Sequence, residues 1–301
     1  GEAPPVQGER PPVVLMAEDL AARLRRLHVE PLGVDGQVRI SLAGVQQKLV
    51  LSRLPGGSWA LPIDGRPSTH ILKRADPRFP DMVLNEAFCL AVGRHMGVSV
   101  AGADVLRIPD PILVVERYDR HVERDGRIRR VHQEDMAQAL GAPLGVKYEQ
   151  QGGPGLRAVA RLLREQGLGS EDLLRLLDTT LLNVLVGNAD AHAKNLSLLH
   201  PEPGPIRLAP AYDVVSTAYY PQVDPRPGMY INGKTSIHEV VADDVIAEAV
   251  SWRLAPDLAR RRVESLLAAV PAAIEAAAAE VPGVPADLVA LVRQRCRPAG
   301  S

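Results

Sequence analysis

Three polar residues in the second half of the chain have the types and the spacing of a phosphoryl-transfer site. Asp190 and Asn195 lie five residues apart in the polar stretch Asn188–Asn195, and Asp213 follows eighteen residues later. A protein-kinase catalytic loop places its base and a metal-binding amide at this spacing. One carboxylate could orient an acceptor hydroxyl, while two oxygen ligands could hold Mg²⁺ between the phosphates of a nucleotide. The same residue types also favour an ordinary polar turn, so the motif needs support from the rest of the chain.

The lysines of this chain are few, and three of them fall in stretches whose composition suggests chemistry. Only five of the thirty-five basic residues are Lys, at positions 48, 73, 147, 194 and 234. A compact ammonium and a planar guanidinium are not interchangeable as phosphate ligands. A chain that otherwise uses Arg therefore has a reason to keep each Lys. Lys48, Lys73 and Lys194 become candidate phosphate ligands on this ground.

The composition predicts a folded chain that is large enough for two lobes. It has 301 residues, of which 46% are apolar, and a formal net charge of −1. Such a charge gives no overall field that would draw the chain to nucleic acid or to anionic lipid. Cys89 and Cys296 show no metal-ligand spacing, no run has the length of a membrane span, and the start has no signal-peptide pattern. We therefore expect a reducing, cytoplasmic setting without a membrane, and the missing initial Met suggests absent upstream residues.

The first half of the chain predicts a loop that could lie over a nucleotide. Residues 1–14 are Pro-rich and are expected to be a flexible lead-in, and Met16–Leu27 has the apolar spacing of a helix. Gln37–Leu51 has the pattern of a strand, a loop with one glycine and a second strand. Small residues in such a turn let backbone N–H groups approach a triphosphate. A plain β-hairpin has the same pattern and stays open as an alternative.

A lysine on a strand is followed by a glutamate on a helix. Thr69–Lys73 is a predicted strand, and the predicted helix Pro80–Met96 carries Glu86. In the small lobe of a kinase the strand lysine holds the α- and β-phosphates, and the helix glutamate holds the lysine. A solvated helix charge is an equally open interpretation of Glu86.

Two further predicted strands precede a second half that is mainly helical. This change in pattern predicts two domains, residues 15–118 and 119–301. The strands are Ala103–Ile108 and Ile112–Tyr118, and the second leads into the connection between the lobes. The later elements are predicted helices at His132–Leu140, Leu156–Gln166 and Ser170–Val186, with Ser170 as N-cap, and strands at Leu196–Leu199 and Ile206–Ala209. From His238 to Arg297 the pattern is Ala/Leu-rich helix, broken at Pro256, Pro271 and Pro282.

Five motifs follow one another along the chain: Ser-Leu-Ala-Gly-x-Gln-x-Lys-Leu (41–49), Val-Glu-Arg-Tyr-Asp-Arg (115–120), Val-His-Gln-Glu-Asp (131–135), Gly-Asn-Ala-Asp-Ala-His-Ala-Lys-Asn (187–195) and Leu-Ala-Pro-Ala-Tyr-Asp-Val (208–214). Together they resemble the HipA family of bacterial serine/threonine protein kinases. The resemblance covers nearly everything from about residue 15 onward. It implies an α+β, bilobal, protein-kinase-like fold with a β-rich small lobe and a mainly helical large lobe.

The resemblance also implies a role for each matching residue. Asp190 would be the catalytic base, and Asn195 and Asp213 would hold Mg²⁺. Lys73 would bind the α- and β-phosphates of ATP, with Lys48 and the backbone of Ala43 and Gly44 over the nucleotide. Glu116 and Tyr118 would meet the adenine through their backbone, and His192 and Lys194 would line the phosphate site. Ser41 would be a regulatory autophosphorylation site; it is the only hydroxyl residue between Gln37 and Leu51.

The partners expected from the resemblance are those of a toxin–antitoxin pair. Members of the family phosphorylate translation factors such as aminoacyl-tRNA synthetases, and a DNA-binding HipB-like antitoxin restrains them, so DNA would be reached only through the antitoxin. Full-length members carry a small N-terminal subdomain before the Ser41 region, where this chain has forty residues. Either that piece has been lost from this chain, or a separate small protein supplies it. A nucleotide-binding regulatory subunit of a DNA-bound complex and a small-molecule kinase are the alternatives.

Overall fold

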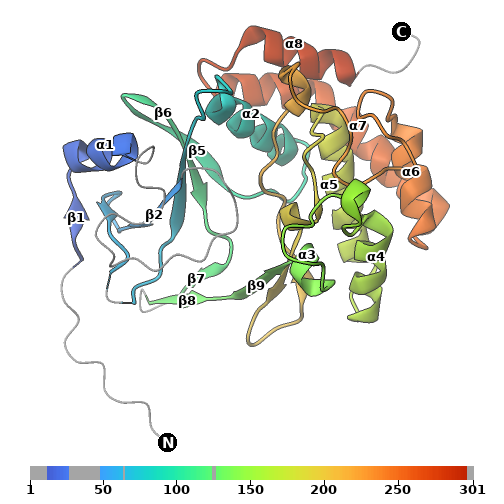
Figure 1. Cartoon of the computed structure of the whole chain (residues 1–301), viewed down its shortest axis with the longest axis horizontal. Helices are drawn as coiled ribbons and strands as arrows, with labels where there is room; N and C mark the ends of the chain where they lie inside the picture. Colours follow the sequence, from blue (N-terminus) through green and yellow to red (C-terminus); the bar gives the residue numbers. More distant parts are fainter. Residues whose placement is uncertain (1–11, 27–47, 64, 124–126, 297–301) are drawn as a thin grey trace, which may run out of the picture.

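The small lobe is built on a six-stranded antiparallel sheet. The computed structural model describes residues 12–26, 48–63, 65–123 and 127–296 of the chain (Figure 1). The strands follow the order β1-β3-β2-β4-β6-β5. Their bounds are β1 Val14–Leu15, β2 Lys48–Arg53, β3 Trp59–Ala60, β4 His70–Arg74, β5 Ala103–Ile108 and β6 Asp110–Glu116.

The two faces of this sheet bury different sets of side chains. Successive residues of a strand point to opposite faces, so residues two apart share a face. One face packs against α1 (Ala17–Arg26) in a small core of its own, formed by Leu15, Leu20, Leu24, Leu49, Leu51, Leu72, Ile112 and Val114. The alternating residues Val50, Ile71 and Val115 line the cleft on the other face. The alternation thus separates a structural face from a face that is available to a ligand.

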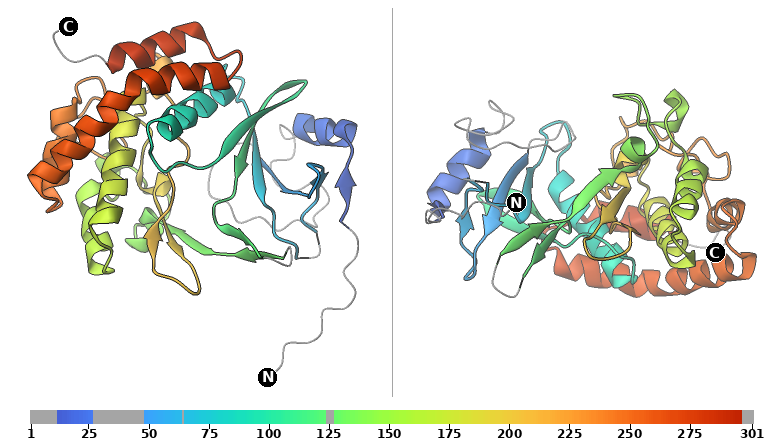
Figure 2. Two further views of the ribbon diagram at one scale, coloured as in Figure 1. Left: turned by 180° about the vertical axis from the view of Figure 1, so that it is seen from behind. Right: turned by 90° about the horizontal axis from the view of Figure 1, so that it is seen from below.

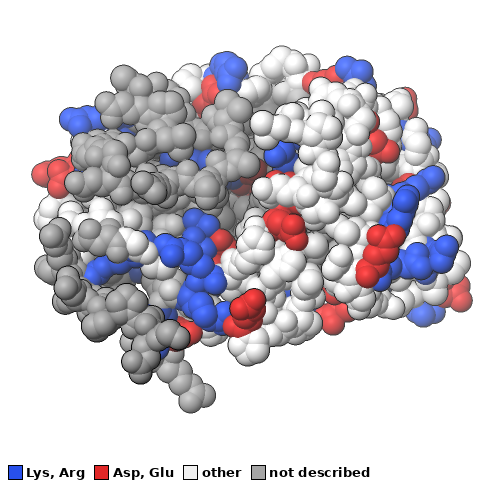
Figure 3. All heavy atoms as spheres, turned by 60° about the horizontal axis from the view of Figure 1, so that its bottom comes forward, with Lys and Arg blue, Asp and Glu red and all other residues white. Residues whose placement is uncertain are grey.

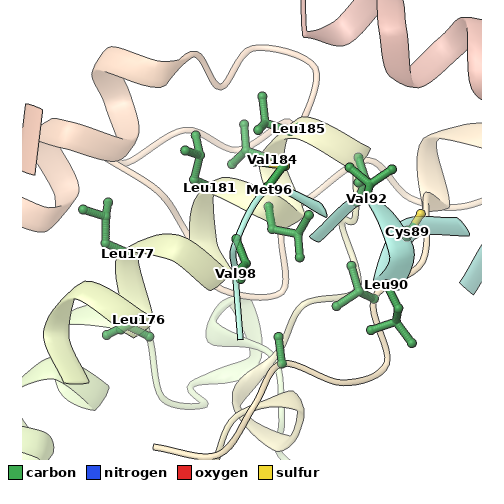
Figure 4. Close-up of a cluster of buried hydrophobic side chains, with 14 of the residues drawn as sticks. Cys89, Leu90, Val92, Met96, Val98, Leu176, Leu177, Leu181, Val184 and Leu185 are labelled. Carbon is green, nitrogen blue, oxygen red and sulfur yellow. The ribbon is translucent and has the colours of Figure 1, made fainter. Parts of the chain in front are cut away.

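Helix α2 (Met82–His95) joins the two lobes. It is buried over Val83–Gly93, as expected of a helix that is apolar on nearly every side. It contacts β5 and β6 of the small lobe and α7 of the large lobe. Figure 4 shows Leu90 and Val92 of α2 in the same buried cluster as Leu181 and Leu185 of α5. The position of Glu86 on this helix is therefore fixed by the largest core of the molecule.

The large lobe consists of helices around two small sheets. Strands β9, β10 and β11 form one antiparallel sheet in the order β11-β10-β9, and β7 and β8 form a hairpin. Figure 2 shows α7 and α8 along one side of the molecule, with α2 between them and the small-lobe sheet. Among the described helices, none is both long enough and apolar enough to cross a membrane. The bounds are β7 Arg120–Val122, β8 Ile128–Arg130, β9 His132–Asp135, β10 Ser197–His200, β11 Arg207–Leu208, α3 Met136–Ala139, α4 Leu156–Glu165, α5 Ser170–Val186, α6 Ala242–Ser251, α7 Pro256–Glu280 and α8 Ala286–Arg295, with 3₁₀ turns η1 Glu149–Gln151, η2 Ala193–Asn195 and η3 Thr217–Tyr219.

The predicted helix His132–Leu140 is wrong in its first half. Residues 132–135 form strand β9, which pairs with β10 along its whole length, and only Met136–Ala139 is helical. A strand partner more than sixty residues away overrides the local helical pattern. Asp135 then caps the short helix, because its carboxylate accepts the N–H of Gln138 at 2.9 Å.

The predicted break in the helix at Pro271 is wrong. Helix α7 runs from Pro256 to Glu280 through Pro271, since packing against α2, α5, α6 and α8 outweighs one missing backbone hydrogen bond. The segment before Ala242 is not helical, so α6 also begins later than predicted. Ser170 is the first residue of α5, and the N-cap is Gly169 without a side-chain hydrogen bond.

The ends and the predicted nucleotide loop lie partly outside the described residues. The structure does not describe residues 1–11 of the predicted lead-in. It also does not describe the segment 27–47, which includes the predicted strand before Ser41. Val14 is the first residue of β1 and pairs with Ala60. The predicted boundary between Tyr118 and Asp119 falls in the connection between β6 and β7.

Candidate active site

Residues from both lobes line one large cleft. The lining contains eight Lys or Arg and six Asp or Glu side chains, in a chain whose net charge is −1. Figure 3 shows Lys and Arg side chains gathered in a band on one face of the molecule, with Asp and Glu side chains beside it. The cleft is thus the place where the chain concentrates charge. Its basic lining residues are Lys48, Arg66, Lys73, Arg117, Arg120, Arg130, Lys147 and Lys194, and its acidic ones are Glu86, Glu116, Asp119, Asp135, Asp190 and Asp213.

An ammonium and two carboxylates meet where three segments converge. Lys73 on β4 donates to Oε1 of Glu86 on α2 at 2.8 Å and also to Oδ1 of Asp213. Burial lowers the pKa of Lys73, but the two carboxylates outweigh burial and raise it above its usual value. Lys73 is therefore a fixed positive charge that does not depend on a bound nucleotide.

The two carboxylates of this cluster differ in exposure. The side chain of Glu86 is 3% exposed and that of Asp213 is 41% exposed. Burial raises the pKa of Glu86 to about 7, although Lys73 opposes the shift. For Asp213 burial also raises the pKa, but Lys73 outweighs it and holds the pKa below the usual range. Glu86 is thus an inner anchor, whereas Asp213 stays ionised and faces the cleft.

Asp213 has a backbone conformation that a non-glycine residue rarely adopts. Its φ is 57°, in the left-handed region. The segment is anchored by Tyr212, whose hydroxyl donates to the carbonyl of Lys194 at 2.7 Å, and by Ala211, which bonds to the backbone of Ser99 and Ala101. Such strain persists only where the surroundings over-determine it, and it occurs often at functional sites.

The loop after α5 is braced from two sides. Helix α5 ends at Gly187, whose φ of 75° suits glycine at a helix C-terminus. Thr217 accepts the N–H of Ala189 at 2.7 Å and donates to the carbonyl of Gly187. From the other side Gly228 donates to the carbonyl of Ala189 at 2.7 Å, and a Cβ there would lie 2.7 Å from the carbonyl oxygen of Ala191. The polar loop is therefore held in one conformation.

The structure brings Asn195 and Asp213 together. Asn195 Nδ2 donates to Asp213 Oδ2 at 3.3 Å, and Asn195 Oδ1 accepts the N–H of His192 at 3.1 Å. Among the described residues no group of three or more His, Cys, Asp or Glu could hold a metal ion. Mg²⁺ needs only one or two protein oxygens beside phosphate and water, so this pair has the chemistry for Mg²⁺.

Asp190 lies on the exposed side of the cleft. Its N–H donates to Asn188 Oδ1 at 3.1 Å, and its Oδ1 accepts the hydroxyl of Tyr148 at 2.6 Å. Tyr148 was not among the residues predicted from the sequence. Forty-two residues separate Tyr148 from Asp190, and no local motif marks the connection.

The other predicted phosphate ligands occupy the cleft in different ways. Lys48 lies directly opposite Lys73 in the pairing of β2 and β4, and burial, followed by the charge of Lys73, lowers the pKa of Lys48. Lys194 Nζ lies 3.7 Å from Oδ2 of Asp135, the cap of α3. Burial lowers the pKa of His192, whose Nδ1 has no hydrogen-bond partner among the described residues.

The predicted adenine contacts lie at the connection between the lobes. The N–H of Glu116 donates to the carbonyl of Gly102 at 2.8 Å, so this N–H is already occupied. The N–H of Tyr118 donates to no residue that the structure describes, and both residues line the cleft. Ser41, Ala43 and Gly44 lie outside the described residues, so their predicted roles stay predictions, as do the roles of the residues above.

The comparisons with known proteins point to one family. A family model described as HipA-like C-terminal domain matches residues 40–277. The kinase Y4mE of Sinorhizobium fredii is 40% identical over 270 residues, which cover 88% of this chain and 63% of that protein. The serine/threonine-protein kinase toxin HipA of Shewanella oneidensis is 30% identical over 250 residues, which cover 77% and 56%. The chain thus spans about six tenths of the length of these curated relatives.

Two solved structures share the fold. The Shewanella oneidensis HipA, in a complex with HipB and its operator DNA, superposes with a TM-score of 0.80 at 27% identity over 98% of this chain and 72% of that one. The kinase CtkA of Helicobacter pylori superposes with a TM-score of 0.50 at 13% identity over 75% of this chain and 84% of that one, a likeness of fold alone. The bilobal, kinase-like α+β fold predicted from the sequence is confirmed.

Proposed function

The chain belongs to the family of HipA-like C-terminal domains, and from this premise we propose that it is an ATP-dependent serine/threonine protein kinase. The observation that carries the proposal is the convergence of Lys73, Glu86 and Asp213 at the cleft, with Asn195 on Asp213. These contacts join a strand, a helix and two loops from distant parts of the sequence. A kinase needs this combination of a fixed positive charge and metal-binding oxygens.

ATP would lie in the cleft with its triphosphate toward Lys73. The protonated Lys73 offsets charge on the α- and β-phosphates, and Lys48 lies on the neighbouring strand. Asp213 and Asn195 would hold Mg²⁺, which supplies further charge neutralisation when bound. The carbonyl of Glu116 and the N–H of Tyr118 would meet the adenine. The mixed lining of basic and acidic groups suits a metal–nucleotide complex.

Phosphoryl transfer would then depend mainly on position and charge. Asp190 orients the acceptor hydroxyl and accepts its proton, while a bond forms between the acceptor oxygen and the γ-phosphorus. The bond from the γ-phosphorus to the bridging oxygen breaks, and ADP leaves with that electron pair. The braced loop of Asp190 keeps the base in place during the transfer.

The biological role proposed is that of a toxin in a toxin–antitoxin pair. The support is the family, together with a relative that is named a HipA toxin and a solved HipA in complex with HipB and operator DNA. The proposed partners are a HipB-like antitoxin, through which DNA is reached, and a separate small protein that corresponds to the N-terminal subdomain. The proposed acceptor is a translation component of the aminoacyl-tRNA synthetase class.

Autophosphorylation of Ser41 is part of the proposal, although Ser41 lies outside the described residues. A phosphate there adds roughly −1.5 to −2 charges beside the nucleotide and competes for Lys48. We expect it to weaken ATP binding and switch the kinase off. Phosphopeptide mapping after incubation with MgATP tests the site, and an unmodified Ser41 in a protein that phosphorylates another acceptor rejects it. Ser41→Asp should then bind ATP less tightly than Ser41→Ala.

The test of the proposed function is transfer of label from [γ-³²P]ATP in the presence of Mg²⁺. The protein is incubated alone and with a bacterial extract, and the label is measured in protein and in small-molecule fractions, with intact mass as a second readout. Label on protein serine or threonine supports the proposal. Label in metabolites alone identifies a small-molecule kinase. ATP binding without any transfer of label supports the alternative, a regulatory nucleotide-binding subunit.

A further inference from the structure

The hydroxyl of Tyr148 lies on the carboxylate that the proposed mechanism uses as its base. It donates to Oδ1 of Asp190 at 2.6 Å. Burial and the hydrogen bond to Asp190 raise the pKa of Tyr148, so its hydroxyl stays protonated and acts as the donor. An acceptor serine or threonine must present its hydroxyl to this same carboxylate within hydrogen-bond distance. Two hydroxyl groups thus compete for Asp190.

The backbone around Tyr148 is firmly attached to the segment that supports the catalytic loop. The N–H of Glu149 donates to the carbonyl of Gly228 at 2.9 Å, and Oε2 of Glu149 accepts the N–H of Tyr230 at 2.6 Å. A Cβ on Gly155 would lie 2.4 Å from the Glu149 carboxyl carbon, so that carboxylate is closely enclosed. Gly228 in turn bonds to Ala189. The placement of Tyr148 on Asp190 is therefore specified by the fold.

The side chain of Tyr148 is held less firmly than its backbone. It is half-buried, and its ring meets the His192 ring in a T-shaped contact at a centroid distance of 5.3 Å, while Lys147 Nζ lies 4.7 Å from the ring centre. The anchoring contacts belong to Glu149 and not to the Tyr148 ring. The phenol can therefore leave Asp190 by a side-chain rotation while the surrounding segment stays in place.

We propose that Tyr148 is a specificity-determining residue that occupies the acceptor position on Asp190, so that an acceptor hydroxyl must displace it. This inference rests on the proposed kinase function. Water and weakly docked hydroxyls compete poorly with a donor that is tethered at the base. A hydroxyl presented by a docked protein competes well, because docking raises its effective concentration at Asp190. Tyr148 would thus select against hydrolysis of ATP and in favour of a bound protein acceptor.

The opposite interpretation is that Tyr148 is needed to orient Asp190, as a third group often orients a catalytic base. The two interpretations predict changes of opposite sign. Removal of a competitor lowers the KM for the acceptor and raises the rate of ATP hydrolysis, with little change in the KM for ATP. Removal of an orienting group lowers kcat and leaves the acceptor KM unchanged.

Tyr148→Phe tests the proposal, because it removes the hydroxyl and keeps the ring that contacts His192 and Lys147. The measurements are phosphate release from MgATP without an acceptor and steady-state transfer to dephosphorylated casein, as a generic serine-containing probe. We expect about tenfold faster hydrolysis and about a tenfold lower casein KM. Tyr219→Phe is the matched control, since its hydroxyl bonds to Asp287 on an exposed surface. The gain should vanish in Tyr148→Phe/Asp190→Asn.

Each outcome of this experiment decides the proposal. A lower kcat at unchanged casein KM, or no change in either reaction, overturns the acceptor role of Tyr148 while the kinase function stands. If neither the wild-type protein nor Tyr148→Phe releases or transfers phosphate while both bind ATP, the proposed function fails and the inference fails with it. Phosphate on Tyr148 of the wild-type protein would support its place at the acceptor position.

Discussion

The two sides of the cleft are held in different ways. On the proposed phosphate side, Lys73 bonds to the buried Glu86 and to Asp213, and these three residues come from a strand, an interlobe helix and a loop. On the proposed acceptor side, Asp190 is exposed, and among the described residues its carboxylate accepts one hydrogen bond, from Tyr148. Lys194 on the same loop lies 3.7 Å from Asp135.

The side chains on the phosphate side are thus positioned by the fold itself, whereas those on the acceptor side still depend on a ligand for their final positions. Loss of one partner from a buried ion pair leaves an uncompensated charge and is strongly destabilising, whereas an exposed pair contributes little. Substitutions on the phosphate side should therefore change nucleotide binding and, where the group is buried, folding as well. Substitutions on the acceptor side should change the rate of transfer and leave both nearly intact.

The largest effect is expected at Asp190, where a loss of rate without a loss of ATP affinity would distinguish the acceptor side of the cleft from the phosphate side. Asp190→Asn keeps the shape of the side chain but removes the base, so kcat for phosphoryl transfer should fall by ~10²-fold or more. Affinity for MgATP should stay within a few-fold, because Asp190 contacts the acceptor. Rates are measured by label transfer and affinity by calorimetry, with the exposed Asp243→Asn on α6 as a control. More than about a tenth of the wild-type rate would remove Asp190 from the mechanism.

Asp213→Ala should act on the phosphate side through the metal. Two protein oxygens are a usual share for Mg²⁺, so loss of one should weaken ATP binding at saturating Mg²⁺ by at least ~10-fold. With EDTA in place of Mg²⁺ the two proteins should bind ATP with nearly equal affinity. A magnesium titration of ATP affinity makes the measurement. Parallel titration curves for the wild-type protein and Asp213→Ala would refute the assignment of Asp213 as a ligand.

The sequence contained the parts of the site that local patterns can encode. Asp190 and Asn195 share one loop, so their spacing alone indicated their chemistry. Lys73 at the end of a strand and Glu86 on the next helix were each predicted from periodicity. Their meeting depends on the fold, and the kinase-like fold was available only from the resemblance. The short apolar runs in β2, β4 and β6 predicted strands, which the structure contains.

Contacts between distant segments were beyond the local patterns. Nothing near Tyr148 indicates that its hydroxyl reaches Asp190, and nothing near Thr217 indicates that it braces the loop at Ala189. Strand β9 was predicted as helix because its partner β10 lies far along the chain. Pro271 was predicted to break a helix that packing on several sides sustains. In each case tertiary contacts outweigh a local preference.

Glu86→Gln tests whether the buried Glu86 contributes to nucleotide binding. Gln can still accept the hydrogen bond of Lys73, but the bond loses the share that comes from charge, so ATP affinity should fall about tenfold. The free energy of unfolding should also fall, by ~1–3 kcal/mol, because the buried Lys73 loses one of its two charged partners and keeps Asp213. Calorimetry and urea unfolding measure the two quantities, with the exposed Glu264→Gln as a control. Unchanged ATP affinity would place Glu86 outside the nucleotide site and make it purely structural.

The smallest effect is expected at Lys194, and its size tests whether the acceptor side is as loosely held as it looks. Its ammonium lies 3.7 Å from Asp135, and a partly exposed pair at this distance contributes at most ~1 kcal/mol. Lys194→Met should therefore lower kcat/KM for transfer by less than about fivefold. Lys234→Met, outside the cleft lining, is the matched control. Asp135→Asn keeps an N-cap on α3 while it removes the charge, so a double-mutant cycle isolates the pair. A loss of tenfold or more in kcat/KM that persists in the Asp135→Asn background would show that Lys194 acts on the phosphates directly. The two sides of the cleft would then differ less than their contacts indicate.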